Sequence, residues 1–296
     1  KDTQTEEFTV FGIGDMGGDV FGNGMLLSEK IQLVAAFNHL HIFIDPTPDA
    51  ASSFKERKRL FENLGGWDQY NTDLISKGGG IFSRADKEIK LTPEIQKLLG
   101  VRKEVMSPNE LMTAILTMKA ELFWNGGIGT FIKSTSETHA DASDRANDSI
   151  RINAPQLNVK VIGEGGNLGM TQKARIEAAR HGVHLNTDAI DNSAGVDCSD
   201  HEVNIKILID KAVSDGNLKE ADRNRLLANM TNEVSDLVLR DNYLQTQLLS
   251  YETVMRAVPS ADAHWRMMKN FEKQGMLDRA VEFLPDDDEM AGRIKN

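Results

Sequence analysis

Runs of apolar residues alternate with helix-forming stretches over the first two thirds of the chain. Each run is short and bounded by glycine, asparagine, proline or charged residues, which is typical of a buried strand. Strands that alternate with helices indicate a doubly wound, mostly parallel sheet, so we expect an α/β, Rossmann-like fold. The expected strands are residues 8–11, 31–37, 41–44, 81–84, 120–124, 159–163 and 182–186.

The stretches between these runs carry helix signals. Thr92 supplies a capping hydroxyl before Pro93, a residue suited to the first helical position. Ser107 is followed three residues later by Glu110, which completes a capping box. Residues 134–153 are polar, and we expect a solvated loop and a helix there. The other expected helices are residues 20–30, 53–64 and 171–181.

The pattern changes near residue 200. Beyond it the chain reads as helix formers without strand-like runs, interrupted at Gly216-Asn217 and Pro259-Ser260. We therefore expect two domains, an α/β domain over residues 1–199 and an all-α C-terminal region over residues 200–296. We expect Asp286-Asp287-Asp288 to begin a helix, because acidic residues favour helix N-termini. The main helices expected here are residues 203–214, 220–241 and 243–258.

Composition narrows the classes of partner. The 296 residues carry a net charge of −11, which argues against nucleic acid or an anionic membrane as the main partner, since either requires a basic face. The single cysteine, Cys198, excludes an internal disulfide framework. No apolar run approaches the ~18 residues of a membrane span. We expect a cytoplasmic protein and, because the chain begins at Lys1 and ends inside an expected helix, a fragment of a longer one.

The most informative local pattern follows the first strand. Residues 8–11 lead directly into Gly12-Ile13-Gly14-Asp15-Met16-Gly17 and then into a helix-compatible stretch. In a dinucleotide-binding turn, Gly12 makes the tight turn, Gly14 lets the backbone approach a pyrophosphate, and Gly17 lets the helix pack on the strand. The phosphates would sit on free N–H groups at the helix N-terminus. An ordinary glycine-rich turn between strand and helix would leave the same pattern.

Two further motifs stand in order along the chain, Glu164-Gly165-Gly166-Asn167 after an expected strand and Asn192-Ser193-Ala194-Gly195-Val196 near the end of the α/β region. Together with the glycine turn, they resemble the coenzyme domain of glutamate dehydrogenases. The closer resemblance is to the large bacterial NAD-specific glutamate dehydrogenases. It covers essentially the whole chain and is specific over residues 8–205. Its further features are the segments 18–23, 41–46, 76–80 and 124–130.

The resemblance implies a cofactor and a reaction. The cofactor is NAD, which accepts a hydride from the α-carbon of L-glutamate, and the imine formed is hydrolysed to 2-oxoglutarate and ammonia. In the family, the glutamate-binding lysines and the catalytic acid belong to a substrate domain that precedes the coenzyme domain. We therefore expect this chain to bind NAD, to contain no catalytic residue, and to be inactive alone. We expect a homo-oligomer in the full-length protein.

The resemblance also implies site residues. Asn167 would lie near the nicotinamide ribose, and Asn192 would face the nicotinamide and the substrate. Asn125, Gly126 and Gly127 follow a strand and could line either side of the cofactor, or form a plain turn. These join Gly12, Gly14, Asp15, Met16 and Gly17 of the first turn as the expected cofactor-binding residues.

Two residues are candidates for binding the adenosine ribose. Asn38 stands about where an acid is expected, and Asp45 is the next acid, so either could reach a ribose hydroxyl. Asp15 and Asp19 would repel a pyrophosphate unless they point away from it or cap the helix. Lys77, which precedes three glycines, is expected to be a loop residue. The histidines have no metal-ligand spacing, so no metal site is expected.

Two other functions fit the same motifs. One is another amino-acid dehydrogenase, of the leucine or phenylalanine type. The other is an NAD-sensing or assembly module that uses the helical tail as a contact. The enzyme hypotheses require Asn167 and Asn192 to converge at the nicotinamide end, whereas a sensor requires only the pyrophosphate and adenosine contacts.

Overall fold

The computed structural model describes residues 1–255, 257–282 and 284–295. The chain forms two compact units, Lys1–Val238 and Leu239–Asn296, and each is described by itself. The two units are defined only by contacts between residues and do not test the expected domains. The division into residues 1–199 and 200–296 therefore stays a prediction.

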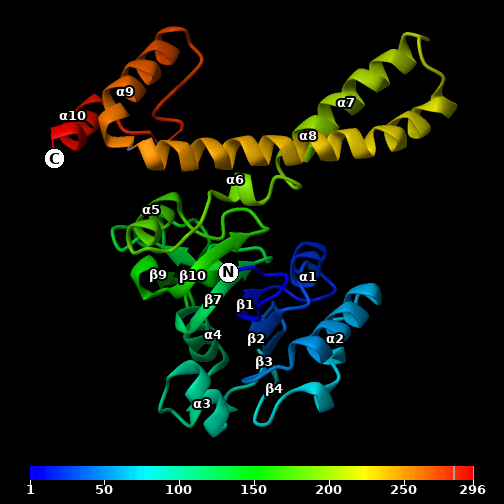
Figure 1. The fold of residues 1–296 in the computed structure, drawn as a ribbon, viewed down its shortest axis with the longest axis vertical. Helices are drawn as coiled ribbons and strands as arrows, with labels where there is room; N and C mark the ends of the chain where they lie inside the picture. The colour runs from blue at the N-terminus through cyan, green and yellow to red at the C-terminus, as the bar shows by residue number, and fades with distance from the viewer. Residues whose placement is uncertain (256, 283, 296) are drawn as a thin grey trace. The chain divides into compact units, whose positions relative to one another are not determined.

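A six-stranded sheet in the order β10-β7-β1-β2-β3-β4 forms the centre of the first unit (Figure 1). Four strands run parallel, which confirms the expected mostly parallel α/β fold. The parallel strands are β1 (Phe8–Ile13), β2 (Ile31–Phe37), β7 (Lys119–Asn125) and β10 (Asn158–Glu164).

The other edge of the sheet is a meander. β3 (His41–Ile44) runs antiparallel to β2, and β4 (Gly80–Ser83) runs antiparallel to β3. Only three residues separate β2 from β3, too few for the crossover that a parallel neighbour needs. At the opposite edge, the strand expected at residues 182–186 is reduced to one bridge between Val161 and His184.

Helices cover both faces of the sheet. On one face, α1 (Asp19–Leu26) and α2 (Ala50–Glu62) share a buried cluster with Val10, Leu33 and Trp67. On the other face, α3 (Pro93–Leu99), α4 (Pro108–Thr117) and α5 (Gln172–Arg180) share a cluster with Phe11 and Phe123, whose rings stack at 4.9 Å. Successive side chains of a strand point to opposite faces, so Val10 and Phe11 belong to different clusters. The caps of α3 and α4 are the expected Thr92 and Ser107.

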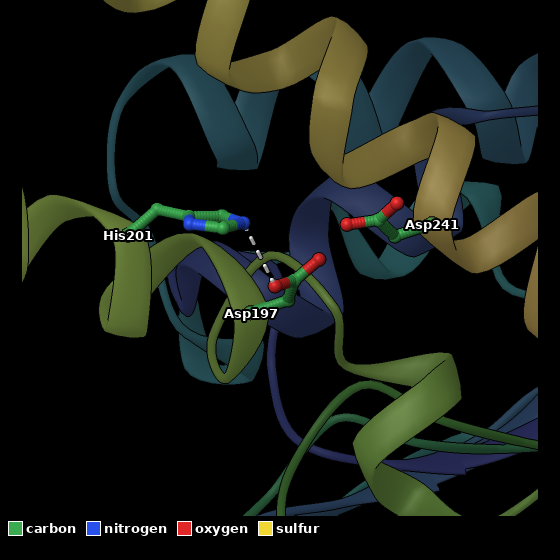
Figure 2. A group of neighbouring side chains, drawn as sticks. All are labelled: Asp197, His201 and Asp241. Carbon is green, nitrogen blue, oxygen red and sulfur yellow. Dashed lines mark ion pairs between the residues drawn. The ribbon is translucent and has the colours of Figure 1, made fainter.

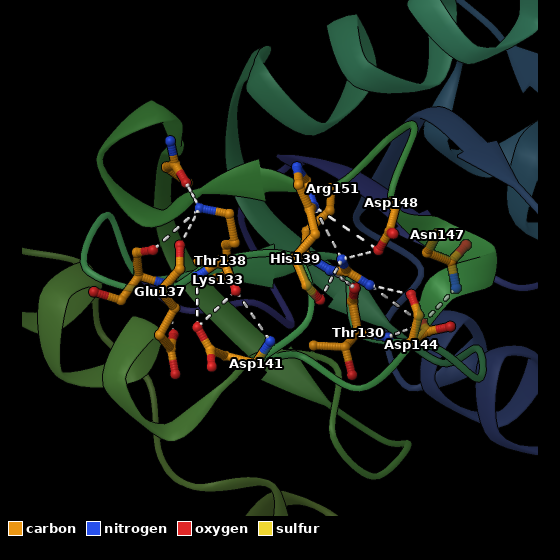
Figure 3. Close-up of polar contacts among 12 residues, drawn as sticks. Thr130, Lys133, Glu137, Thr138, His139, Asp141, Asp144, Asn147, Asp148 and Arg151 are labelled. Atoms are coloured by element: carbon orange, nitrogen blue, oxygen red, sulfur yellow. Dashed lines mark hydrogen bonds and ion pairs between the residues drawn. The ribbon is translucent and has the colours of Figure 1, made fainter.

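Most of the polar segment between β7 and β10 is exposed, as expected of a loop, but it folds around the buried Lys133 and Arg151 (Figure 3). The side chain of Arg151 is fully buried and donates to the Thr130 carbonyl at 2.7 Å and to Asp148 at 2.5 Å. Lys133 donates to the Glu137 carbonyl at 2.8 Å. The expected helix is wrong, because this segment forms only the 3-10 turn η3. Its elements are β8 (Ile132–Lys133), η3 (Arg145–Asn147) and β9 (Ile152–Asn153).

The short elements complete the α/β part. They are η1 (Trp67–Gln69), η2 (Thr72–Leu74), β5 (Ile89–Lys90), β6 (Val105–Met106), η4 (Ala154–Gln156) and α6 (Asp188–Asp191).

The C-terminal third is helical, as expected. After α7 (Asp197–Ser214), α8 (Glu220–Met255) continues without the break expected near residue 242. In the second unit, α9 (Ala257–Lys273) and α10 (Asp287–Lys295) are joined where Trp265 donates to Asp287 at 2.7 Å. The acidic run at residues 286–288 begins α10, as predicted. Within the described ranges, no helix combines the length and apolarity of a membrane span.

The two stacked phenylalanines allow a test of the core. Phe123→Ala is expected to lower the free energy of unfolding by about 3–5 kcal/mol, because Phe123 is fully buried. Leu27→Ala is the control, since Leu27 is 75% exposed and its loss should change stability by less than about 0.5 kcal/mol. Urea unfolding followed by circular dichroism measures both. Equal effects of the two variants would contradict this packing.

Candidate functional site

A crevice opens where the strand order reverses. From β1 the chain passes through α1 to β2 on one side, and it later returns to β7 on the other side of β1. Ligands of doubly wound sheets bind at this position, outside the carboxyl ends of the strands. The cavity there has a volume of about 600 Å³, within the usual range of ligand sites. Its lining includes Gly14, Asp15, Gly18, Asn38, His39, Arg84, Gly126, Gly127, Ala146 and Asn147.

The glycine turn closes tightly on Phe21 of α1. Gly14 has φ +134°, a conformation that favours glycine, and a Cβ there would lie 2.6 Å from the Cβ of Phe21. A Cβ on Gly12 would lie 2.6 Å from the carbonyl oxygen of Trp124. Packing therefore demands both glycines, whatever occupies the crevice.

Three residues of the turn do not line the cavity. Gly12 packs as described above, and Met16 is fully buried in the cluster beneath α1 and α2. A Cβ on Gly17 would lie 2.8 Å from the carbonyl oxygen of Leu64, so Gly17 permits close packing of the helix start. These three residues therefore support the turn by packing and do not line the cavity.

The backbone of the turn offers donors. The main-chain N–H groups of Asp15, Met16 and Gly17 have no acceptor among the described residues. They directly precede α1, and N–H groups at a helix start favour an anion. Of these three residues Asp15 lines the cavity, so its free N–H is a donor suited to an anion there. The expected diphosphate contact stays a prediction.

The two acids near this turn do not point at its free donors. Asp15 Oδ1 accepts from the Gly18 N–H at 3.0 Å, and Asp15 Oδ2 accepts from Asn38 Nδ2 at 2.8 Å. Asp19 is exposed and accepts from Asn23 Nδ2 at 2.7 Å. The Asp19 carboxylate thus lies along the surface of α1, whereas the Asp15 carboxylate is bonded at the helix start and lines the cavity.

Asn38 and two unexpected basic residues, His39 and Arg84, border the crevice. Asn38 Oδ1 accepts from the N–H groups of Leu40 and His41, which stabilises the turn between β2 and β3. Arg84 donates to the Asn38 carbonyl at 2.9 Å, and burial lowers the pKa of its guanidinium. Arg84 and His39 both line the cavity. The signal for Arg84 is its position directly after β4, whose carboxyl end lies at the same edge of the sheet as that of β2.

Asp45 does not reach the crevice. Because β3 runs antiparallel, its last residue lies toward the opposite edge of the sheet, where the Asp45 N–H bonds the carbonyl of Val34. Asp45 is fully buried and accepts from the N–H of Ser76 at 3.1 Å and from the Ser76 hydroxyl. Burial raises the pKa of its carboxyl group, against the lowering effect of these bonds. The structure therefore separates Asp45 from the other expected site residues.

Asn125, the last residue of β7, bonds the loop that follows β10. Its carbonyl accepts from Gly165 at 2.9 Å and from Gly166 at 3.2 Å, so β7 holds the start of the Glu164 motif. The Asn125 side chain is buried, and neither its oxygen nor its nitrogen has a partner among the described residues. Gly126 and Gly127 line the cavity, as expected.

The two asparagines expected at the nicotinamide end lie together. Asn192 Nδ2 donates to Asn167 Oδ1 at 2.8 Å. A Cβ on Gly166 would lie 2.8 Å from the Gly127 carbonyl, so this loop packs beside the crevice. Neither asparagine lines the cavity itself. The two side chains meet each other, while their convergence on the nicotinamide end, which the enzyme hypotheses require, stays a prediction.

A buried ion pair fixes the loops that carry these asparagines. Arg175 on α5 donates to both carboxylate oxygens of Glu164, at 2.8 and 2.9 Å, and lies 3.3 Å from Asp188 of α6. The Glu164 N–H donates to Asp191 at 3.0 Å. Burial raises the pKa of Glu164, against the lowering effect of Arg175. The sequence analysis missed Arg175, although an arginine in the helix after an acidic turn is a visible signal.

Other candidate groups lie outside the crevice. Lys77 is exposed and pairs with Glu94 at 3.2 Å, as a loop residue would. On α7, His201 pairs with Asp197 at 3.2 Å (Figure 2). The third residue in that figure, Asp241, belongs to the other unit. An ion pair between residues four apart stabilises a helix, and these two groups of the first unit fall short of the ligands that a metal site needs.

The buried Asp45 gives a pH test. A raised pKa in the folded state means that stability is present below the ordinary value of 3.8 and lost as pH rises through the folded value. Asp45→Asn removes this loss, so the unfolding free energy of the variant relative to the wild type should increase as pH rises from about 4 to about 7. Urea unfolding at several pH values measures the difference.

Asp49 provides the control for that test. Its hydrogen bonds to Ser52 lower the pKa of Asp49, so its stabilising effect is present above 3.8 and lost in acid. Asp49→Asn should therefore lose stability relative to the wild type as pH rises, the opposite slope. The same slope for both variants would contradict the assignment of Asp45 as a buried structural acid.

Comparisons with known proteins agree with the resemblance. The family described as bacterial NAD-glutamate dehydrogenase, catalytic domain, matches residues 1–252. The NAD-specific glutamate dehydrogenases of Halomonas elongata and Pseudomonas aeruginosa are 58% and 56% identical to the chain over 295 residues. In each case the match covers 99% of this chain and 18% of the relative. The chain therefore spans less than a fifth of the length of these relatives.

A solved structure is a more distant match. The glutamate dehydrogenase of Plasmodium falciparum is 11% identical to the chain, with a TM-score of 0.36. The match covers 62% of this chain and 30% of that one. At this distance it places no residue of the site.

Proposed function

We propose, from the premise that this chain belongs to the bacterial NAD-glutamate dehydrogenase family, that it is the part of such an enzyme that binds NAD. The full-length enzyme would oxidise L-glutamate to 2-oxoglutarate and ammonia. The observation that carries this proposal is the turn with free N–H groups at Asp15, Met16 and Gly17, of which Asp15 lines the cavity at the switch point of the sheet.

Different residues would bind different parts of the cofactor. The turn amides would bind the pyrophosphate, and Asn38, His39 and Arg84 would border the adenosine half. When bound, NAD supplies the hydride acceptor. The Asn167–Asn192 pair would orient the nicotinamide end, because each side-chain amide can donate and accept.

The remaining machinery is proposed to lie outside this chain. No catalytic residue is assigned within it, and the groups that bind glutamate would come from the substrate domain of the full-length protein. We also propose that the full-length protein forms a homo-oligomer. A cytoplasmic setting is also proposed, supported by the single cysteine Cys198, which is free in the structure.

The cavity can be filled without touching a glycine. Ala146 is exposed and lines the crevice, so Ala146→Trp in the full-length enzyme should raise the Kd for NADH at least about tenfold, a loss of ~1.4 kcal/mol. Ala140 is exposed on the same segment but does not line the cavity, so Ala140→Trp should leave the Kd unchanged. Titration followed by NADH fluorescence measures both.

The outcomes separate the candidate functions. Equal NADH affinity in Ala146→Trp and the wild type would contradict the crevice as the cofactor site. Turnover assays of the full-length enzyme with L-glutamate, L-leucine and L-phenylalanine identify the substrate. NADH binding without turnover of any of them would favour the sensing module.

The contact between Asn167 and Asn192 gives a second test. Asn167→Ala and Asn192→Ala are each expected to lower kcat/KM of the full-length enzyme, and their effects should be coupled by about 0.5–3 kcal/mol because the two amides bond each other. Asn23 lies on the exposed face of α1, so Asn23→Ala combined with Asn167→Ala should be additive. Additive effects within the Asn167–Asn192 pair would show that the two side chains act separately.

A further inference from the structure

The end of β2 lacks the acid that usually reads the adenosine ribose. Dinucleotide-binding folds carry an aspartate or glutamate there, which hydrogen-bonds the ribose 2′-hydroxyl. Here the residue is Asn38, which is nearly buried and neutral. Its Oδ1 accepts from Leu40 at 2.8 Å and from His41 at 2.7 Å, so its oxygen is already engaged.

The negative charge at this point comes from the glycine turn instead. Asp15 Oδ2 accepts from Asn38 Nδ2 at 2.8 Å, and Oδ1 accepts from the Gly18 N–H at 3.0 Å. These two bonds fix the carboxylate beside the end of β2. Of the described residues that line the crevice, Asp15 is the only acid.

The geometry points to Asp15 as the residue that makes this site prefer a ribose 2′-hydroxyl over a 2′-phosphate. This inference rests on the proposed NAD site and names the determinant of its specificity. A 2′-hydroxyl can donate a hydrogen bond to a carboxylate. A phosphate in the same place brings a like charge against the half-buried Asp15, which is strongly unfavourable where solvent screening is reduced.

Arg84 makes the charge of Asp15 decisive. It lines the same cavity and donates to the Asn38 carbonyl at 2.9 Å. A guanidinium is a strong partner for phosphate, so Arg84 alone would favour a 2′-phosphate. Loss of the Asp15 charge therefore leaves a site with a cation and no opposing acid.

The test measures binding of two nucleotides to the full-length enzyme. In Asp15→Asn, the ratio of the Kd for NADPH to the Kd for NADH should fall about tenfold or more, since one opposing charge is removed. The asparagine oxygen can still accept from Gly18, but its amide nitrogen cannot accept from Asn38 Nδ2, so circular dichroism must first show that the variant folds. Titrations with NADH and NADPH, each followed by nucleotide fluorescence, give both constants. Adding Arg84→Gln should raise the ratio again.

Asp19→Asn is the matched control. It removes the same charge four residues along, from an exposed side chain that does not line the crevice. Its ratio should equal that of the wild type. A fall of the same size in Asp19→Asn, or no fall in Asp15→Asn, would overturn the inference.

The same titrations distinguish this inference from the proposed function. A wild-type enzyme that does not bind NADH overturns the NAD site, and the role of Asp15 with it. A wild-type enzyme that binds NADH, with a ratio unchanged in Asp15→Asn, overturns the role of Asp15 alone. If Asp15→Asn does not fold, as judged by circular dichroism, Asp15→Ser keeps an oxygen acceptor for Gly18 and is subject to the same criteria.

Discussion

The contact of Phe21 with the glycine turn is the constraint on which the site depends. The fully buried Phe21 lies against Gly12, Gly14 and Gly126, where any side chain would collide with it. This contact joins α1 to the ends of both β1 and β7. The turn that this contact closes leaves the N–H groups of Asp15, Met16 and Gly17 without acceptors among the described residues. The glycine pattern therefore serves packing first, and the anion-binding turn results from that packing.

Buried charges position the rest of the crevice. Arg175 connects the Glu164 loop to α6, while Arg151 fixes the segment that places Asn147 at the cavity (Figure 3). A buried guanidinium that lost its partners would be strongly destabilising. Arg175 and Arg151 therefore each favour the one arrangement of the loops that supplies their partners. Loops over the ends of a sheet are usually the variable part of such a fold. Here buried arginines bond these loops, and a preformed site loses less conformational entropy when a ligand binds.

Local signals predicted the fold well. The parallel strands, the Thr92 and Ser107 caps and the helical tail all follow from patterns within a few residues of each other. The failures depend on contacts distant in sequence. Residues 134–153 look solvated because their charges are numerous, yet Arg151 is buried by partners that only the folded loop supplies. The direction of β3 was missed, and with it the place of Asp45, because an apolar run does not state which way its strand runs.

The structure brings several of the predicted site residues together. Gly14, Asp15, Asn38, Gly126 and Gly127 line one cavity, and Asn167 meets Asn192, while their contacts with NAD stay a prediction. Arg84 and His39 belong to no motif. A single basic residue after a short strand is common in any sequence, so neither was predicted. The hydrogen bond between Asp15 and Asn38 joins two positions that a motif search treats as independent.

That hydrogen bond limits how this lineage can vary. An aspartate at position 38, the residue that the general pattern would place there, would set a second carboxylate against Asp15 at a distance suited to a donor and an acceptor. Two ionised carboxylates repel each other at that distance, so an acid at one position disfavours an acid at the other. The positions should therefore covary: a substitution at one becomes tolerable only after its neighbour has changed, and the order in which the two mutations arise decides which ancestors were viable.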